Sequence, residues 1–423
     1  MTTGSGTGSA ELPTDAARGW ARSGVLPLTG NRTGPPLMPP GNAASWAASM
    51  AGHIAEATAG DHRHVRIDGP RLLAERAALT GRTRQGAVSV GGSCRLYRTA
   101  DGWAAVSVAR PDDPALWSAL IGHELDDRFP VRLAAWLAAH TGAELDQRTE
   151  MLGLAGAAVH DHRAVEGRPP GPRRPRSVQG LLVVDFSALW AGPLCAQLLG
   201  LAGAEVVKVE TPDRPDGARR GNRAFYDLLH AGHRSVVLDP ADPSSRKALH
   251  ALVRRADIVI EASRPRALAR FGLDAAAEVE RGCVWVSITA AGRDSQRVGF
   301  GDDVAAAAGL IAWDDAGQPV FCGDAIADPL TGLTAAALAM SEPEGGQCGA
   351  LWDISMADLT AGTLTHHSGE TVPLRHSADG WTVDTGNEYV PVESPVARTP
   401  TGAAPTMGAD TGTMLTRLGI SAV

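Results

Sequence analysis

The sequence predicts an α/β protein that has an open parallel sheet in its second part and a smaller α+β unit before it. After residue 178, apolar stretches typical of buried strands, such as "GLLVVDFS" and "AEVVKVE", alternate with helical stretches. Strands and helices that alternate at this length form βαβ units, and these build parallel sheets. The stretch "RAVEGRPPGPRRPRS" at 163–177 is rich in proline, glycine and arginine. This composition is typical of an extended linker between two parts.

Three more strands follow the first two in the second part, at "RSVVLD", "DIVIEA" and "CVWVSITA". The helices between them are expected at "GPLCAQLLGLAG" and at "PSSRKALHALVRRA", where a serine would cap the helix. In open sheets of this kind, ligands bind beyond the carboxyl ends of the strands. A ligand site is therefore expected at that edge.

The first part has a weaker pattern. Helices are expected at "ASWAASMAGHIAEATAG", "RLLAERAALTG", "ALWSALIG" and "RLAAWLAAHTG". The stretch "CRLYRTADGWAAVSVA" predicts a hairpin that turns at Ala100–Gly102. These features together indicate an α+β unit.

Composition excludes several classes of protein. The net charge is −8 and no basic surface dominates, which argues against a nucleic-acid partner. The five cysteines are widely spaced without a CxxC pair, as expected for a protein of the reducing cytosol without disulfides or a zinc site. No apolar run reaches the roughly 18 residues of a membrane span, and "MTTGSGTGSAELPTD" lacks the features of a signal peptide. We expect a cytoplasmic protein without a membrane partner.

The chain also contains an internal similarity. "SGVLPLTG" from Ser23 parallels "AGLIAWDD" from Ala308, and "TADGW" from Thr99 parallels "SADGW" from Ser377. "RIDGPRLL" from Arg66 similarly parallels "DISMADLT" from Asp353. The order is kept at separations of 278 to 287 residues, which indicates a duplicated half-domain, although chance similarity in an alanine-rich chain is the alternative.

At an offset of 286 residues, Asp328 corresponds to Asn42. In "GDAIADPLTGLTAAALAM", Asp328 precedes Pro329 and an apolar helical run. Proline suits the first helical position, so Asp328 is expected at the N-cap, where the helix dipole would keep its carboxylate ionised. A carboxylate in that place is either a structural cap or a nucleophile, and an amide such as that of Asn42 cannot be the same nucleophile.

The second part resembles the class III CoA-transferase family, which includes formyl-CoA and carnitine CoA-transferases and the 2-methylacyl-CoA racemases. The matching stretches are "VVDFSALWAGPLCAQLLGLAGAEVVKVETP", "HRSVVLDPADP", "ADIVIEASRPRALARFGL", "GDAIADPLTGLTAA" and "LWDISMADL", in family order. The tail from "SPVARTPTG" is similar to the closing segment of the family. The resemblance implies a Rossmann-like CoA-binding catalytic domain at 178–365 and a reduced small-domain remnant with a C-terminal tail at 366–423.

The N-terminal segment 1–162 resembles the later half of the same family, including its small domain. It would therefore be a degenerate half that replaces the missing small domain, either within the chain or across a dimer. The resemblance also implies a homodimer, which in this family is often interlocked.

The resemblance implies CoA transfer from an acyl-CoA to a carboxylic acid, with Asp328 as the nucleophile that forms a covalent intermediate. Coenzyme A would be a substrate, and no permanently bound cofactor is expected. By position, the CoA pocket would contain Trp190, Ala191, Leu238, Ser263, Arg264 and Arg270. Two departures concern this pocket: the chain has "EASRPR" where the family usually has "ENFRPG", and "HAGHRS" where it has "NRGKRS". A phosphate-pairing cation could be missing there.

Parts of the sequence are compatible with other functions. A non-catalytic acyl-CoA-binding relative or assembly partner is the first alternative. A racemase needs a histidine where the resemblance places Phe300 or Asp302. A nicotinamide-binding domain is disfavoured, because "SALWAGP" lacks G-x-G-x-x-G.

Several isolated residues could also carry chemistry. Asp302 and Asp303 could form a reactive pair, but we expect a solvated loop. The histidines in "HDHR" and "THHS" have no third metal ligand at a sensible spacing, and Cys94 has no companion histidine. We expect surface histidines and a buried cysteine.

Overall fold

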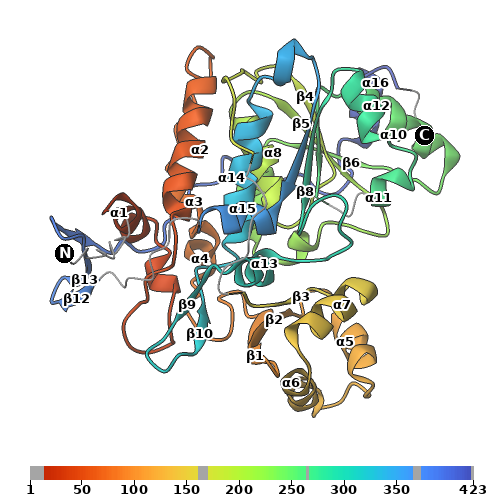
Figure 1. Ribbon diagram of the computed structural model, residues 1–423. Helices are drawn as coiled ribbons and strands as arrows, with labels where there is room; N and C mark the ends of the chain where they lie inside the picture. The colour runs from red at the N-terminus through yellow and green to blue at the C-terminus, as the bar shows by residue number, and fades with distance from the viewer. Residues whose placement is uncertain (1–13, 161–169, 263–265, 365–372, 421–423) are drawn as a thin grey trace, which may run out of the picture.

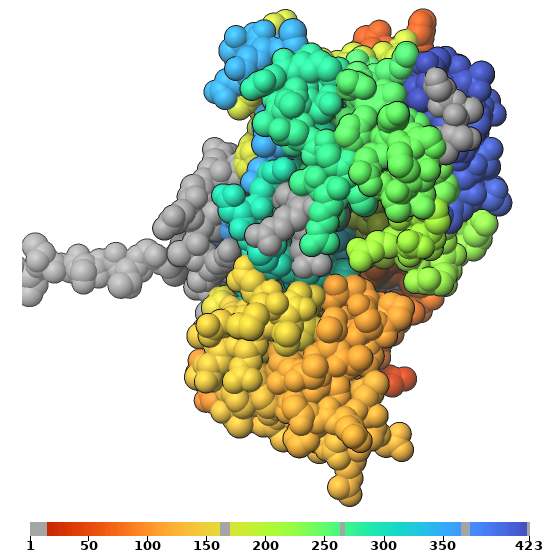
Figure 2. Space-filling view, turned by 90° about the vertical axis from the view of Figure 1, so that its right-hand side faces the viewer, coloured from red at the N-terminus to blue at the C-terminus, as the bar shows by residue number. Residues whose placement is uncertain are grey.

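The computed structural model describes residues 14–160, 170–262, 266–364 and 373–420. Figure 1 shows a large part built around a parallel sheet, with a smaller lobe below it. Figure 2, turned by 90°, shows this lobe, which covers residues 94–158, below the bulk of the molecule. The α/β architecture with a separate N-terminal α+β unit is confirmed.

The large sheet has six parallel strands in the order β11-β8-β7-β4-β5-β6. Its first strand in the chain, β4, lies in the interior of the sheet and pairs with β5 on one side and β7 on the other. The connections therefore run in opposite directions from β4, which makes the gap between β4 and β7 a topological switch point. The strands are β4 (Leu182–Asp185), β5 (Glu205–Glu210), β6 (Arg234–Val237), β7 (Ile258–Glu261), β8 (Val284–Thr289) and β11 (Ala350–Ser355).

The five strands expected from the sequence are present, and β11 was not predicted. Alternate strand residues supply two apolar clusters, because successive side chains point to opposite faces. Val183 belongs to one cluster and Val184 to the other. The helices that follow the strands or pack on them are α8 (Ala191–Leu201), α9 (Arg223–His230), α10 (Pro243–Arg255), α11 (Arg266–Ala269), α12 (Ala275–Glu280) and α16 (Thr411–Arg417).

The predicted serine cap of α10 was wrong, because Asp242 is the N-cap and accepts a hydrogen bond from Ser245 N at 2.7 Å. The carboxylate of Asp242, two residues before Ser244, serves the same exposed N–H groups.

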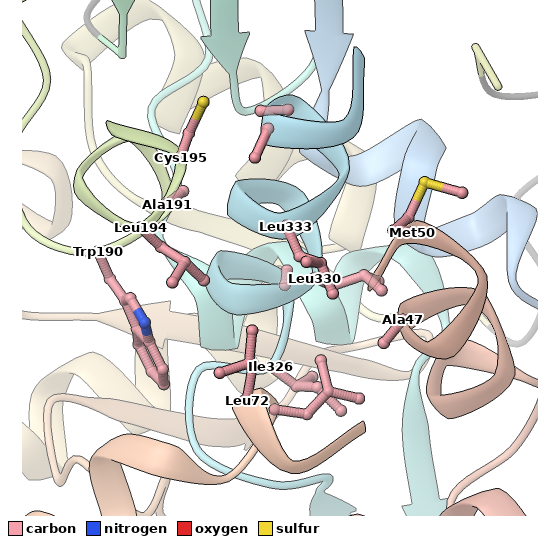
Figure 3. Close-up of a cluster of buried hydrophobic side chains, with 14 of the residues drawn as sticks. Ala47, Met50, Leu72, Trp190, Ala191, Leu194, Cys195, Ile326, Leu330 and Leu333 are labelled. Carbon is pink, nitrogen blue, oxygen red and sulfur yellow. The ribbon is translucent and has the colours of Figure 1, made fainter. Parts of the chain in front are cut away.

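Helix α14 (Ala327–Ala339) is the centre of the molecule. Figure 3 shows it between α8 and α2 (Ala43–Ala57), with Leu194 on one side and Ala47 and Met50 on the other. Leu330 and Leu333 are fully buried, and each contributes about 1.5 to 3 kcal/mol by that burial. At Gly332 an added Cβ would lie 2.4 Å from Ala191 O, so only glycine allows α8 to approach this closely. A helix that is apolar on all sides is a core helix.

The first part contributes four helices to the large part and a separate small lobe. In the lobe, β1, β2 and β3 form an antiparallel sheet in that order, covered by three helices. The predicted hairpin is confirmed, since Arg98 pairs with Trp103 across the turn. The elements are α1 (Thr14–Arg22), α3 (Gly69–Leu72), α4 (Glu75–Thr80), β1 (Cys94–Arg98), β2 (Trp103–Ser107), α5 (Asp113–Ile121), α6 (Phe129–Ala139), α7 (Gly142–Leu152) and β3 (Gly156–Ala158).

Near the C-terminus, a second three-stranded antiparallel sheet, β12-β13-β14, repeats the order of β1-β2-β3. It packs on α1, whereas the first small sheet packs on α13. Each small sheet thus lies against a helix of the other half of the chain. The remaining elements are α13 (Gly301–Ala308), β9 (Ile311–Trp313), β10 (Pro319–Phe321), α15 (Met356–Gly362), β12 (Leu374–Ser377), β13 (Gly380–Asp384) and β14 (Tyr389–Pro391).

Contacts between α2 and α14 join positions that correspond in the internal similarity. Trp46 Nε1 donates to Thr334 Oγ1 at 2.9 Å across 288 residues. His53 Nε2 lies 3.2 Å from Met340 O across 287 residues. Both separations lie within two residues of the offset of 286, so α2 packs against the stretch to which the internal similarity relates it. The duplication itself stays a prediction.

The linker runs along the end of α14 where it is described. Arg176 N donates to Met340 O at 2.8 Å, and Pro175 forms an isolated bridge with Ser341. No regular helix or strand interrupts the described residues 170–177, in agreement with the predicted extended linker.

Candidate active site

A pocket of about 140 Å³ lies at the carboxyl edge of the large sheet. Its walls come from the segments that follow β4, β7, β8 and β11, so it lies at the switch point of the sheet. This is the edge at which the sequence predicted a ligand. The lining residues are Ala188, Leu189, Ala191, Ala262, Ile288, Thr289, Ala290, Ser295, Arg297, Val298, Gly299, Phe300, Asp328 and Met356.

Asp328 is the acid of this pocket. Its side chain is partly exposed, whereas its neighbours in α14 are buried. The N-cap of α14 is Ile326, so Asp328 lies at the second helical position and the predicted N-cap was wrong. The reason is a turn at Ala325, whose carbonyl accepts a hydrogen bond from Asp328 N at 2.9 Å and begins the helix earlier.

The backbone is strained on two sides of the pocket. In the described chain, Leu189 (φ 71°) and Ala325 (φ 47°) are the non-glycine residues with positive φ. Leu189 lines the pocket and Ala325 lies three residues before Asp328. Such strain costs roughly 1 to 3 kcal/mol for each residue and is often found at functional sites. Its position therefore supports a site here.

Buried ionic contacts hold the β4–α8 loop that carries Leu189. Lys208 Nζ donates to Ser187 O at 2.8 Å and lies 2.9 Å from Asp216 Oδ2. Asp216 Oδ1 accepts from Leu189 N at 3.0 Å, and Asp185 Oδ1 accepts from Ser187 N at 2.8 Å. The charges fix the loop in its strained form because a buried ion must keep its partners.

Three further acids surround the start of α14. Asp302 and Asp303, in the first turn of α13, and Asp324, before α14, are all buried. The predicted solvated loop at Asp302 and Asp303 was therefore wrong. Their backbone lies at the start of a helix that packs between α15 and the small lobe.

Each of these acids has hydrogen-bond donors. Asp302 Oδ1 accepts from Ala325 N at 2.8 Å, and Asp303 Oδ1 accepts from Ser107 Oγ at 2.6 Å. Asp324 Oδ2 accepts from Nε of Arg76 at 2.9 Å. The guanidinium of Arg76 also lies 4.7 Å from the ring centroid of Trp190.

Burial raises the pKa of three carboxyl groups here. Burial raises the pKa of Asp328 to about 7, although the charge of Arg76 opposes this shift. Burial likewise raises the pKa of Asp302 to about 6 and that of Asp303 to about 7. The helix start was expected to keep Asp328 ionised, but desolvation raises its pKa, so only part of the carboxylate is ionised at neutral pH.

The N-terminal part contributes directly to the site. Thr29 Oγ1 accepts from Gly323 N at 3.1 Å. Arg297, which lines the pocket, lies with its Nη2 2.6 Å from Asp146 Oδ1 on α7 of the small lobe. A short parallel bridge between Ala155 and Val298 joins the same two segments. Within this chain, the first small lobe therefore supports the pocket in cis.

The residues predicted to contact CoA lie in different places. Ala191 lines the pocket, and Trp190 is the buried residue beneath Arg76. Leu238 is buried in the second apolar cluster, and Arg270 is exposed on the surface. Ser263 and Arg264 lie outside the described residues. The assignment of these residues to CoA stays a prediction.

Other candidates are resolved by their surroundings. Cys94 is buried, and burial raises the pKa of its thiol well above the usual value, so it is a core residue. The described residues contain no group of three metal-ligating side chains. His162, His366 and His367 lie outside the described residues.

Sequence reasoning missed Arg76, Asp324 and Arg297. Asp324 stands in the quoted stretch "GDAIAD", and an acid four residues before another was a usable signal. Arg76 and Arg297 gave no such signal, because their roles depend on contacts with segments far along the chain.

Helix α7 could have been found from Thr141 and Glu144, which form a capping box.

Residues 178–410 match the family described as CoA-transferase family III. The chain belongs to this family. The chain is 30% identical over 232 residues to succinate–glutarate CoA-transferase of Agrobacterium fabrum, an alignment that covers 48% of this chain and 58% of that protein. It is 34% identical over 104 residues to formyl-CoA:oxalate CoA-transferase of Rhodopseudomonas palustris (strain TIE-1), covering 23% and 24%. The class III resemblance is confirmed.

Part of the chain is also similar to solved structures. A CAIB/BAIF family protein from Brucella suis is 25% identical, with a TM-score of 0.43 and coverage of 49% of this chain and 66% of that one. The chain thus spans little more than half the length of the succinate–glutarate relative and about two thirds of this structure. No helix among the described residues is long and apolar enough to cross a bilayer.

Proposed function

We propose that the protein transfers CoA from an acyl-CoA to a free carboxylic acid, with Asp328 as the covalent nucleophile. The observation that carries this proposal is the place of Asp328: a partly exposed acid in a pocket at the switch point of the sheet. A carboxylate there can reach a thioester that enters along the carboxyl edge of the strands.

The first half of the reaction has two steps. The Asp328 carboxylate attacks the thioester carbonyl, and the CoA thiolate leaves, which gives a mixed anhydride. The thiolate then attacks the aspartyl carbonyl and expels the first carboxylate, which leaves CoA bound to Asp328 as a thioester. The bond energy of the thioester is kept, so no nucleotide is consumed.

The second half reverses these steps with the acceptor. The acceptor carboxylate attacks the aspartyl thioester and releases the thiolate, which then attacks the acceptor's acyl carbonyl and frees Asp328. A pKa of about 7 leaves a large share of Asp328 ionised at neutral pH, as a nucleophile requires.

Arg297 is the cation of the same pocket and is proposed to hold the carboxylate of the donor or acceptor acid. Every exchange places a free carboxylate beside Asp328, and like charges repel at such short range. A guanidinium offsets that repulsion and matches the two oxygens of a carboxylate. We expect Arg297→Met to raise KM for the acid by about tenfold or more, with a smaller change in KM for the acyl-CoA.

A racemase is not favoured by the pocket. Its two-base reaction needs a second proton carrier opposite the acid. The resemblance places Phe300 or Asp302 at the position of the base, and neither is histidine. Phe300 lines the pocket, whereas Asp302 is not among its lining residues, and none of the described lining residues is histidine.

The test is an exchange assay with a panel of acyl-CoAs and free acids, beginning with succinate, glutarate and oxalate, the acids in the relatives' names. We expect a new acyl-CoA to form with wild-type protein and not with Asp328→Asn. Formation of free CoA alone, or equal rates in both proteins, would contradict the proposal. Loss of the α-hydrogen to deuterated solvent would instead indicate a racemase.

The expected homodimer and cytoplasmic location belong to the same proposal. Light scattering after size-exclusion chromatography gives the oligomeric state, and fractionation of the source cells gives the location. A monomer would indicate that the internal pairing of the two halves replaces the pairing of two chains.

A further inference from the structure

We propose that Arg76, on α4 of the N-terminal part, is a positioning residue for Asp328: it fixes the turn before α14 and holds a positive charge behind the carboxylate. This inference rests on the proposed function, because it concerns the residue proposed to react. It assigns to the N-terminal part a role in the chemistry in addition to packing.

The geometry ties Arg76 to the start of α14. Its guanidinium forms a two-point ion pair with Asp324, whose side chain is fully buried. Asp324 precedes Ala325, the strained residue that begins the turn of Asp328. The other face of the guanidinium lies over Trp190, next to the pocket residue Ala191. Arg76 therefore joins both backbone segments that shape the site.

The charges around Asp328 come from four elements. Arg76 lies on α4, Asp302 on α13, Asp324 in the turn before α14, and Arg297 in the loop before α13. Of these charges, that of Arg76 has the largest effect on the pKa of Asp328, and it acts downward. Asp302 and Asp324 act upward, each by less. Arg76 is thus the group that offsets burial and keeps part of the carboxylate ionised.

The two partners of the Arg76–Asp324 pair make opposite predictions. In Arg76→Met the carboxylate loses its cation, so its pKa should rise by about one unit. In Asp324→Asn the cation remains and a nearby negative charge is lost, so the pKa of Asp328 should fall, by less than it rises in Arg76→Met. Both changes break the same ion pair, so both should lower stability. A merely structural role would give shifts of the same sign, or none.

Glu75→Gln provides the matched control. Glu75 is the neighbour of Arg76 on α4, and its carboxylate also forms a buried ion pair across the chain, with Arg398 at 2.8 Å. This variant should lose stability and leave the titration of Asp328 unchanged. Arg76→Lys keeps the positive charge but not the two-point geometry. The pKa of Asp328 should therefore rise less in this variant than in Arg76→Met.

The measurement is a pH titration of aspartate side chains by carbon-13 NMR in the whole protein, with the Asp328 signal assigned by its loss in Asp328→Asn. It reads the pKa whether or not CoA is transferred, so the inference can fail while the proposed function holds, or the reverse. Opposite shifts in Arg76→Met and Asp324→Asn support the inference. Shifts of the same sign, no shift in folded Arg76→Met, or an equal shift in Glu75→Gln would overturn it. The acidic limb of the transfer rate should move with the titration.

Discussion

The helices α14 and α2 pack against each other at the centre of the molecule, but their first turns differ in chemistry. Asp328 opens α14 within a pocket that has strained backbone and three buried acids around it. Asn42 opens α2, its N–H donates to Thr363 O at 2.9 Å, and its buried Oδ1 has no hydrogen-bond partner among the described residues. The acid stands in the first turn of α14, whereas an amide stands at the start of α2.

This difference shows what the N-terminal half of the chain contributes to the site. Without an acid at position 42, the N-terminal half still supplies Arg76 and Ser107 to the acid cluster, and Thr29 to the turn before α14. Its small lobe also holds Arg297. The N-terminal half therefore has the role of a support for one site, and the following changes test that division.

The largest expected effect comes from replacing Asp328, in the first turn of α14, whereas replacing Asn42, at the start of α2, should change the rate little. Asp328→Asn should reduce the rate of CoA transfer by about a thousandfold or more, because an amide cannot form the anhydride. Asn42→Ala should leave the rate within about twofold, since it removes an unpaired carbonyl rather than a hydrogen bond. Steady-state assays with circular dichroism as a folding check decide the matter. Similar losses in both variants would refute the asymmetry.

Replacing one glycine in each half of the chain with alanine gives the next largest effect on activity. At Gly301 an added Cβ would lie 2.6 Å from Asp328 Oδ2 and 2.3 Å from Ala325 O, so Gly301→Ala should displace the carboxylate and lower kcat/KM by about a hundredfold. Gly52 on α2 has open space around it. Gly52→Ala should raise the free energy of unfolding by about 0.5 to 1 kcal/mol and leave kcat/KM unchanged. Wild-type activity in Gly301→Ala would be incompatible with the site as described.

The acids of α13 predict how stability depends on pH. Burial raises the pKa of Asp303 to about 7, so the folded protein holds this proton to higher pH than the unfolded chain does. Stability is therefore lost as pH rises from about 4 to about 7. Asp303→Asn should remove this loss. From pH 5 to pH 8, the free energy of unfolding of the variant should therefore rise by about 1 to 3 kcal/mol relative to that of wild type.

Urea denaturation at the two pH values measures the change. The control is Asp314→Asn, because hydrogen bonds lower the pKa of Asp314, first of all that from Asn31. Both pH values lie above the pKa of Asp314 in the folded and the unfolded chain, so the control should lose the same stability at pH 5 and at pH 8. An Asp303→Asn variant whose stability follows wild type at both pH values would contradict the stated cause.

The smallest effect concerns the hydrogen bond between α2 and α14. Trp46→Phe and Thr334→Val each remove one side of the same hydrogen bond, and each should lower the free energy of unfolding by about 1 kcal/mol. A double-mutant cycle should give a coupling energy of about 0.5 to 1.5 kcal/mol. Additive effects would show that the two helices do not interact through this pair.

The fold was largely predictable from sequence because its signals are local. Five of the six parallel strands are short apolar runs between turns, and the linker follows from its proline and glycine content. Strand β11 was missed because exposed residues such as Asp353 interrupt its apolar pattern.

The site was predictable in part. Asp328 could be found from its neighbours in sequence together with the family motif. Its ionisation could not, because burial and the charge of Arg76 depend on packing between segments about 250 residues apart. The same reason explains why Asp302 and Asp303 were mistaken for a solvated loop.

The most direct test of the asymmetry is to trap the covalent intermediate. Wild-type protein and Asn42→Asp are mixed with an acyl-CoA that is active in the exchange assay, treated with hydroxylamine, digested, and analysed by mass spectrometry. We expect a hydroxamate on Asp328 in both proteins and none at position 42 of the variant, because the first copy lacks the surrounding site. No hydroxamate at Asp328 in a protein that transfers CoA, or one at position 42, would contradict the account.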